Sequence, residues 1–279
     1  MKETKAETLQ IKKLHPFEGH PFKVADNEEM DQLVESIQAQ GVLTPLVVRP
    51  LNNGEYEVIS GHRRLHACKR AGIETVPAMI TEMDRDAAAI ALVDSNLHRE
   101  HILPSEKAFA YKLKMDALNR QGTSRQVGEK LSVTQISEVT EDSERQIHRY
   151  IRLTNLIPEI LQMVDDGRIA LTPAVELSYL TKWEQKDLLE TMESEDCTPS
   201  LSQAMTLKAA SQTRELNMDR IFDIMTQPKP NQQERIRFDV SDIRKFFPKS
   251  YSPAKIQQTI YQLLESYHRT WKRSDRNDR

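Results

Sequence analysis

A short turn followed by two arginines is the part of this sequence best suited to chemistry. The residues YEVI before Ser60 and Gly61 predict a strand, and the residues HRRLHACKRA after them predict a helix. The first backbone N–H groups of a helix have no partners within it, and here they lie beside the guanidinium groups of Arg63 and Arg64. Strand, turn and helix start together indicate a site for an anion, most naturally a phosphate. The alternative is a surface helix whose arginines are simply solvated.

The elements that position this turn alternate between helix and strand over roughly the first ninety residues. Asn27 is a suitable N-cap for a helix whose apolar positions recur at helical spacing and which ends at Gly41. The Asn-Asn-Gly sequence at residues 52–54 predicts a hairpin turn that leads into the strand before Ser60. The other predicted strands are Leu9–Leu14, Leu46–Arg49 and Thr75–Ile80. This alternation predicts a small α/β unit.

From Asp86 onward the hydrophobic pattern becomes helical. A short helix is predicted over Gln135–Val139, followed by a turn at Thr140–Asp142. A second helix begins at Ser143, and Gln146 three positions later completes an S-x-x-Q capping box. A helix, a three-residue turn and a second, basic helix in this order are typical of a helix-turn-helix motif. Two further elements are predicted on either side of this motif, a helix over Ser124–Leu131 and a strand over Arg235–Val240.

The second helix of this motif carries a stripe of arginines on one face. Arg145, Arg149 and Arg152 follow each other at helical spacing. Ser143, Arg145, Gln146 and Arg149 lie in the first two turns, where side chains reach base edges in the major groove. Arg145 or Arg149 could donate two hydrogen bonds to guanine, and Gln146 could pair with adenine, whereas Arg152 is expected to touch phosphate. A solvated charged face is the alternative.

Composition limits the class of protein. The 279 residues are 38% hydrophobic and 29% charged, and their net charge is −3, so affinity for nucleic acid must come from local basic faces. No apolar run approaches the roughly 20 residues that a membrane span needs, and the N-terminus lacks the apolar segment of a signal peptide. The two cysteines and the scattered histidines have no metal-ligand spacing. A cytoplasmic location without membrane contact is therefore expected.

Three motifs, in order, resemble those of a known family. The first is LHPFEGHPFKVADNEEMDQLVESIQAQGVLTPLVVRP. The second, SGHRRLHACKRAGIETVPAMI, is similar to the family's G-x-R-R-x-x-A phosphate motif, and the third, SNLHRE, is similar to its E-N-x-x-R-E box. With the helix-turn-helix that follows, residues 8–180 resemble the ParB family of bacterial DNA-partition proteins, in its ParB/Noc-like form and of plasmid or mobile-element type.

The resemblance implies an α+β fold with a defined order of domains. Residues 1–112 would form a small α/β ParB-type CTP-binding domain, and residues 113–212 an all-α helix-turn-helix domain. Residues 213–233 would form a linker region, with QPKPNQQ as its clearest part. Residues 234–279 would form a small α/β or helical region, with possible self-association, in which Ser252-Pro253 opens a helix.

The resemblance also implies a mechanism. Family members bind a centromere-like DNA palindrome, and CTP with Mg²⁺ closes their dimer into a clamp that slides along DNA. The chain would thus be nucleoid-associated, a homodimer and a partner of a ParA-type ATPase. Gly61, Arg63 and Arg64 would hold the triphosphate, Arg99 a phosphate and Asn96 the Mg²⁺, while the segment from Gly41 to Pro45 would lie by the base. The full predicted nucleotide site is Gly41, Thr44, Pro45, Ser60, Gly61, His62, Arg63, Arg64, Asn96 and Arg99.

Two departures from the family pattern bear on catalysis. His62 and Ser95 stand where the family often has Glu, so carboxylates that could orient metal or water are absent from both positions. CTP binding is therefore expected to survive better than CTP hydrolysis, unless both changes lie on an exposed rim without consequence. A transcription or nucleoid-occlusion regulator of the same architecture is one alternative function. An enzyme is a less favoured alternative. A sulfiredoxin-type enzyme would need a reactive Cys in the Ser-Gly turn, whereas Cys68 lies on the helix in an apolar setting. A nuclease would need clustered carboxylates to hold metal, and none lies beside Arg63 and Arg64 in the sequence.

Overall fold

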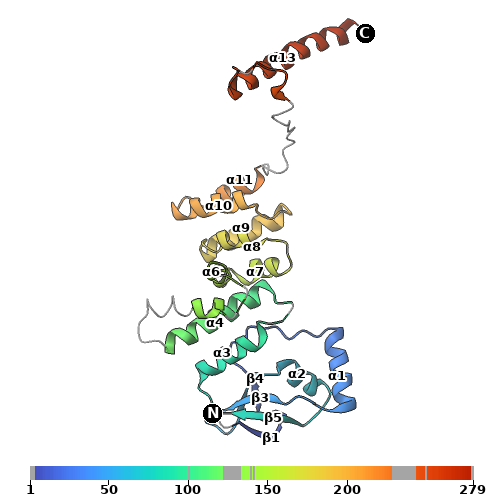
Figure 1. Cartoon of the computed structure of the whole chain (residues 1–279), viewed down its shortest axis with the longest axis vertical. Coiled ribbons are helices and arrows are strands. Elements are labelled where there is room, and N and C mark those ends of the chain that lie inside the picture. The colour runs from blue at the N-terminus through green and yellow to red at the C-terminus, as the bar shows by residue number, and fades with distance from the viewer. Residues whose placement is uncertain are drawn as a thin grey trace. The chain divides into compact units, whose positions relative to one another are not determined.

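The N-terminal part of the chain folds around a five-stranded mixed sheet (Figure 1). The computed structural model describes residues 4–99, 101–121, 133–138, 140, 142–227, 243–248 and 250–277. The strand order is β1-β5-β3-β4-β2, with antiparallel β1/β5 and β3/β4 pairs and parallel β3/β5 and β2/β4 pairs. The strands are β1 (Thr4–Gln10), β2 (Leu14–Pro16), β3 (Leu46–Pro50), β4 (Tyr56–Ser60) and β5 (Thr75–Thr81).

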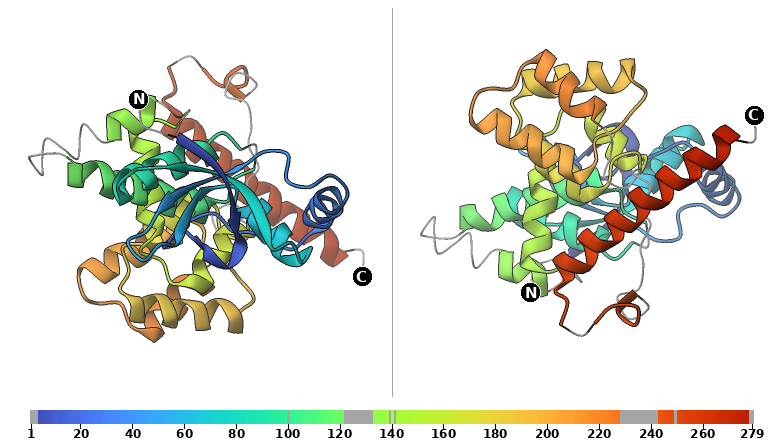
Figure 2. Two further views of the ribbon diagram at one scale, coloured as in Figure 1. Left: turned by 90° about the horizontal axis from the view of Figure 1, so that it is seen from below. Right: turned by 90° about the horizontal axis from the view of Figure 1, so that it is seen from above.

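Helices cover both faces of this sheet because its central strands are apolar on both sides. Val48 and Val58 are buried with the apolar residues of α1 and α2, whereas Val47 and Ile59 pack with those of α3 and α4. Neighbouring strand residues point to opposite faces, so one strand contributes to two cores. Figure 2, left, shows the strands side by side with α1 next to them. The helices are α1 (Glu28–Gln40), α2 (His62–Arg70), α3 (Arg85–Asn96) and α4 (Pro104–Gln121).

The prediction of a single strand over Leu9–Leu14 is wrong. A 3₁₀ turn at Ile11–Lys13 separates β1 from β2, and these two strands form the opposite edges of the sheet. The backbone N–H of Ile11 donates to the carbonyl of Glu74 at 2.9 Å, which fixes the turn at one end of the sheet. Ile11 and Leu14 are both buried. They are apolar because the chain passes through the core here, from one edge of the sheet to the other, and not because they belong to one continuous strand.

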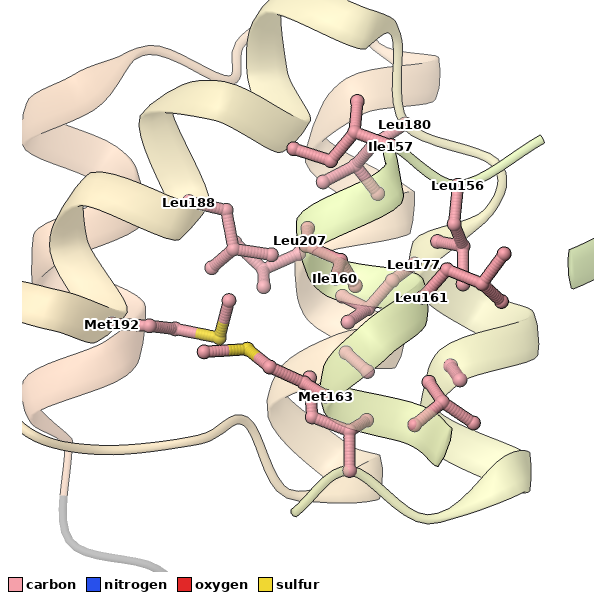
Figure 3. Close-up of a cluster of buried hydrophobic side chains, with 14 of the residues drawn as sticks. Leu156, Ile157, Ile160, Leu161, Met163, Leu177, Leu180, Leu188, Met192 and Leu207 are labelled. Atoms are coloured by element: carbon pink, nitrogen blue, oxygen red, sulfur yellow. The ribbon is translucent and has the colours of Figure 1, made fainter. Parts of the chain in front are cut away.

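A second, helical part follows α4. Residues 133–138 are helical, and α6 follows them, so both helices of the predicted helix-turn-helix are present. The helices beyond share one core, in which Met163 and Met192 point toward one another and Leu188 and Leu207 lie close by (Figure 3). The helices are α6 (Glu144–Leu153), α7 (Pro158–Asp165), α8 (Leu171–Leu177), α9 (Lys182–Ser194), α10 (Leu201–Gln212) and α11 (Met218–Thr226). The predicted α+β class is confirmed.

The predicted linker is corrected in its first half. Helix α11 falls within residues 213–233, and Ile221, Ile224 and Met225 on it are buried in the helical core. Its amphipathic spacing lets it close the bundle, where a linker would expose these side chains. Chain contacts group residues 1–227 as one compact unit and residues 228–279 as another. The predicted boundaries at residues 112 and 212 stay predictions.

The C-terminal unit contains the long helix α13 (Pro253–Asn277), which begins where Ser252-Pro253 predicts a helix. The side chains of Leu263, Leu264 and Tyr267 on it are exposed. The predicted elements Ser124–Leu131 and Arg235–Val240 lie outside the described residues. Within the described ranges, no helix combines the length and apolar character needed to cross a membrane.

Candidate nucleotide and DNA sites

The turn at Gly61 is a site of close approach that only glycine fits. Its φ is +105°, in the region that side chains with a Cβ rarely adopt. A Cβ at this position would lie 3.0 Å from Cγ of Leu46 and 3.1 Å from Nη2 of Arg64. The carbonyl of Gly61 accepts the first helical hydrogen bond of α2, from the N–H of Leu65 at 2.9 Å. The predicted strand, turn and helix start are therefore present, and unpaired N–H groups of the first turn of α2 follow directly.

Arg63 and Arg99 bring two positive charges to this helix start. Nη2 of Arg63 is 3.0 Å from a carboxylate oxygen of Glu29, and both side chains are partly exposed. The guanidinium of Arg99 lies 5.5 Å from the ring centroid of Phe22. Partial burial lowers the pKa of Arg99 and repulsion from Arg63 lowers it further, whereas the carboxylate of Glu106 raises it. An anion near both arginines would offset this repulsion.

Arg64 is half-buried and bonds to backbone carbonyls through one nitrogen, so its predicted contact with phosphate stays a prediction. Its Nη1 donates to the carbonyl oxygens of Thr44 and Pro45, the latter at 2.9 Å. Its half-buried position lowers its pKa through desolvation. Arg64 thus ties α2 to the segment that begins at Gly41, where φ is +75°. Arg64 therefore connects the turn at Gly61 with the segment from Gly41 to Pro45, which is predicted to lie beside the nucleotide base.

His62 is a packed residue and not part of an exposed rim. Only 9% of its surface is exposed, and its Nε2 accepts a 3.4 Å hydrogen bond from the N–H of Phe17. Its ring lies 3.8 Å from that of His20, measured between centroids. Burial, followed by the nearby charges of His20 and Arg99, lowers the pKa of His62 to about 3. The imidazole is therefore neutral near pH 7 and supports the turn from inside.

The predicted magnesium ligand also points into the protein. Asn96 is buried, and its Nδ2 donates to the carbonyl of Leu92 at 2.8 Å and to Oγ of Ser95 at 3.2 Å. The described part of the chain contains no group of three His, Cys, Asp or Glu side chains that could hold a metal. Mg²⁺ in nucleotide sites is usually bound by one or two protein oxygens together with water and the phosphates, so the predicted contact between Asn96 and Mg²⁺ stays a prediction.

A polar cavity of about 690 Å³ lies between Arg99 and the helix-turn-helix. One wall holds Asp142, the residue before the N-cap of α6, which accepts from Nζ of Lys107 at 2.9 Å and from the hydroxyl of Tyr111 at 2.5 Å. Burial, and then the bond to Asp142, raise the pKa of Tyr111. Sequence reasoning missed Lys107 and Tyr111, although their spacing of four places them on one face of α4.

The predicted capping box at the start of α6 is only half formed. The N–H of Gln146 donates to Oγ of Ser143 at 3.3 Å, as expected for an N-cap. The amide oxygen of Gln146, however, accepts from Nη1 of Arg149 at 3.3 Å instead of turning back to the cap. Nη2 of Arg149 donates to the hydroxyl of Thr172, on α8, at 2.6 Å. Two of the predicted DNA-reading residues are therefore joined to each other and to a residue outside the motif.

The three arginines of the predicted stripe differ in their surroundings. Arg145 is exposed. Arg152 packs inward: its Cζ lies 3.8 Å from the ring centroid of Tyr179, and its Nη2 donates to the carbonyl of Ser178 at 3.4 Å. Nζ of Lys208 lies 3.7 Å from the same ring. Arg152 therefore has a packing role besides its predicted contact with phosphate. A groove of about 420 Å³ borders α6 and is lined by residues that include Lys112, Arg145, His148, Arg149, Arg152 and Tyr179.

Comparison with known proteins now identifies the family. Residues 1–97 match the ParB N-terminal domain family. The probable chromosome-partitioning protein ParB of Vibrio cholerae is 29% identical over 238 residues, which are 85% of this chain and 77% of that protein. The probable chromosome 1-partitioning protein ParB of Deinococcus radiodurans is 34% identical over 173 residues, which are 61% of this chain and 55% of that protein. This chain belongs to the ParB family. The predicted plasmid or mobile-element type stays a prediction.

One solved structure similar to this ParB-family chain is C-terminally truncated ParB from Caulobacter crescentus, complexed to the centromeric parS site. It is 23% identical, has a TM-score of 0.43, and the match covers 73% of this chain and 98% of that chain.

The enzyme alternative finds no support at Cys68. The residue lies on α2 and is fully buried. Burial raises the pKa of its thiol, so little of the reactive thiolate is present near pH 7. This environment suits a small apolar core residue.

Proposed function

We propose that this ParB-family chain is a DNA-partition protein that binds CTP in its N-terminal domain and a palindromic DNA site through its helix-turn-helix. One observation carries the nucleotide half of the proposal. The start of α2, opened by Gly61 at φ +105°, lies beside Arg63 and Arg99, which repel one another. A triphosphate supplies the negative charge that this arrangement favours.

Nucleotide binding is tested by calorimetric titration of the full chain with CTP and, for comparison, ATP. Arg63→Ala and Arg99→Ala should each weaken CTP binding about tenfold or more, since each removes a charge-assisted contact. Arg85→Ala is the matched control, because Arg85 is an exposed arginine paired with Glu18 elsewhere on the domain. Equal effects of all three substitutions, or no CTP binding by the wild-type chain, would refute the nucleotide half.

We expect CTP binding to exceed CTP hydrolysis in this chain. Neither His62 nor Ser95 offers a carboxylate, and the side chain of Asn96 is turned toward the backbone of α3. Phosphate release should therefore be slow at CTP concentrations that saturate binding. Rapid release with ordinary turnover would contradict this expectation.

The DNA half of the proposal rests on α6 and the basic groove beside it. Selection of bound fragments from random duplex DNA, with and without CTP, tests it. A palindrome among the selected fragments would support a homodimer, and a change on adding CTP would support nucleotide control of a DNA clamp. The further proposed partner is a ParA-type ATPase, whose hydrolysis rate should rise when this chain is added. A selection that yields no preferred sequence would refute the DNA half.

A further inference from the structure

The guanidinium of Arg149 is held at two points. Nη1 donates to Oε1 of Gln146 at 3.3 Å, within the same helix, and Nη2 donates to Oγ1 of Thr172 at 2.6 Å, across from α8. An arginine side chain has several rotatable bonds, and ordering them on binding costs free energy. Two hydrogen bonds to different elements fix both the position and the plane of the group.

Thr172 is well suited to be one of these two points. It lies in the first turn of α8, and the next three residues, Pro173, Ala174 and Val175, are buried. Its side chain is β-branched and therefore has few rotamers. Helix α8 packs on α6, so the hydroxyl and the guanidinium are placed by one packed core. Thr172 itself is exposed, so it contributes little to that core.

The remaining donors of Arg149 suffice for reading a base. A guanidinium has five N–H groups, and the two bonds described use one from each terminal nitrogen. A second N–H on each terminal nitrogen, together with Nε–H, is left to reach the two acceptors of a guanine edge. The hydroxyl of Thr172, which accepts from Arg149, still has its own hydrogen to donate.

We infer that Thr172 is a positioning residue for DNA sequence recognition, which orients the guanidinium of Arg149 toward a base edge. This inference rests on the proposed DNA-binding function. Loss of the hydroxyl leaves Arg149 able to reach the duplex but no longer fixed in one orientation. Sequence discrimination therefore decreases, while contacts to phosphate, which do not depend on this orientation, are retained.

The test uses the full chain and the duplex obtained by selection, with a scrambled duplex of equal length at the same salt concentration. Thr172→Val removes the hydroxyl and keeps the branched shape, and Thr172→Ser keeps the hydroxyl. Thr172→Val should lower the ratio of specific to non-specific affinity about three- to tenfold, whereas Thr172→Ser should stay within about twofold of the wild type. In an Arg149→Ala background, Thr172→Val should cause no further loss, because the group it positions is gone.

The outcomes separate this inference from the proposed function. A wild-type chain without any preferred duplex overturns the proposed function and the inference with it. A wild-type preference that Thr172→Val leaves intact overturns the inference alone. So does a loss that is equal on both duplexes, or one that persists in the Arg149→Ala background. Thermal unfolding of each variant, expected to be close to that of the wild type, shows that the change in ratio does not arise from unfolding.

Discussion

Substitution of Gly61 by alanine should damage the N-terminal domain more than the same substitution at another glycine with positive φ. Two costs combine at Gly61. A residue with a Cβ in this backbone conformation costs about 1–2 kcal/mol. The new Cβ would also stand 3.0 Å from Leu46 and 3.1 Å from the guanidinium of Arg64, and such overpacking costs about 1–3 kcal/mol. The expected loss in the free energy of unfolding is therefore about 2–5 kcal/mol.

Gly54→Ala is the control that carries the backbone cost without the crowding found at Gly61. Gly54 has φ +77°, close to the positive φ of Gly61, but a Cβ there would meet no heavy atom within 4 Å. Gly54→Ala should therefore lower the free energy of unfolding by only about 1–2 kcal/mol. Hydrogen exchange of the buried amides of β3 and β4, measured in the full-length chain, reports the opening of the sheet. Equal losses for the two variants would refute the role assigned here to the close contact with Leu46 and Arg64.

Three further predictions test the core, the buried histidine and the arginine stripe. Gln185→Leu leaves two buried backbone groups, the N–H of Ile157 and the carbonyl of Leu180, without their partner and should cost about 3 kcal/mol in urea unfolding, whereas Gln212→Leu on the exposed face of α10 should cost little. Because the folded pKa of His62 lies near 3, below its usual 6.5, the unfolded chain binds more protons between these pH values. The free energy of unfolding should therefore fall by about 2 kcal/mol from pH 6.5 to 5, and His62→Asn should reduce this slope. Arg152→Ala should lower stability by about 1 kcal/mol and weaken all duplexes alike, whereas Arg145→Ala should leave stability unchanged within about 0.5 kcal/mol.

The sequence predicts well those elements whose signals are local. The side chain of Asn27 caps α1, and the Asn-Asn-Gly turn joins the antiparallel strands β3 and β4, as predicted. Ser143 likewise caps α6. The exception is the segment around Ile11, where the apolar pattern of a strand is interrupted by a turn. The turn is fixed by a backbone hydrogen bond from Ile11 to Glu74, which lies more than sixty residues away. A local sequence pattern cannot reveal such a distant contact.

Side-chain direction at the candidate site could not be predicted for the same reason. Arg63 and Arg64 are neighbours of the same type, yet one is paired with an exposed carboxylate and the other with the carbonyls of Thr44 and Pro45. The choice is made by residues about twenty to thirty-five positions away in the chain. His62 likewise depends on Phe17. A motif thus predicts which residues gather at a helix start, while the packed fold decides which of them face a ligand.

Two consecutive residues of α4, Glu106 and Lys107, connect the candidate nucleotide site with the start of α6. The carboxylate of Glu106 accepts from the N–H of Lys23 at 2.7 Å, next to Phe22, the ring beneath Arg99. Lys107 holds Asp142, which directly precedes the cap of α6. Because α4 is a continuous helix that packs on α3 and α6, a shift along or around its axis acts on both contacts at once. If an anion bound at Arg99 changes the position of this side chain relative to Phe22, the change is expected to reach the helix that holds Asp142, directly before the start of α6.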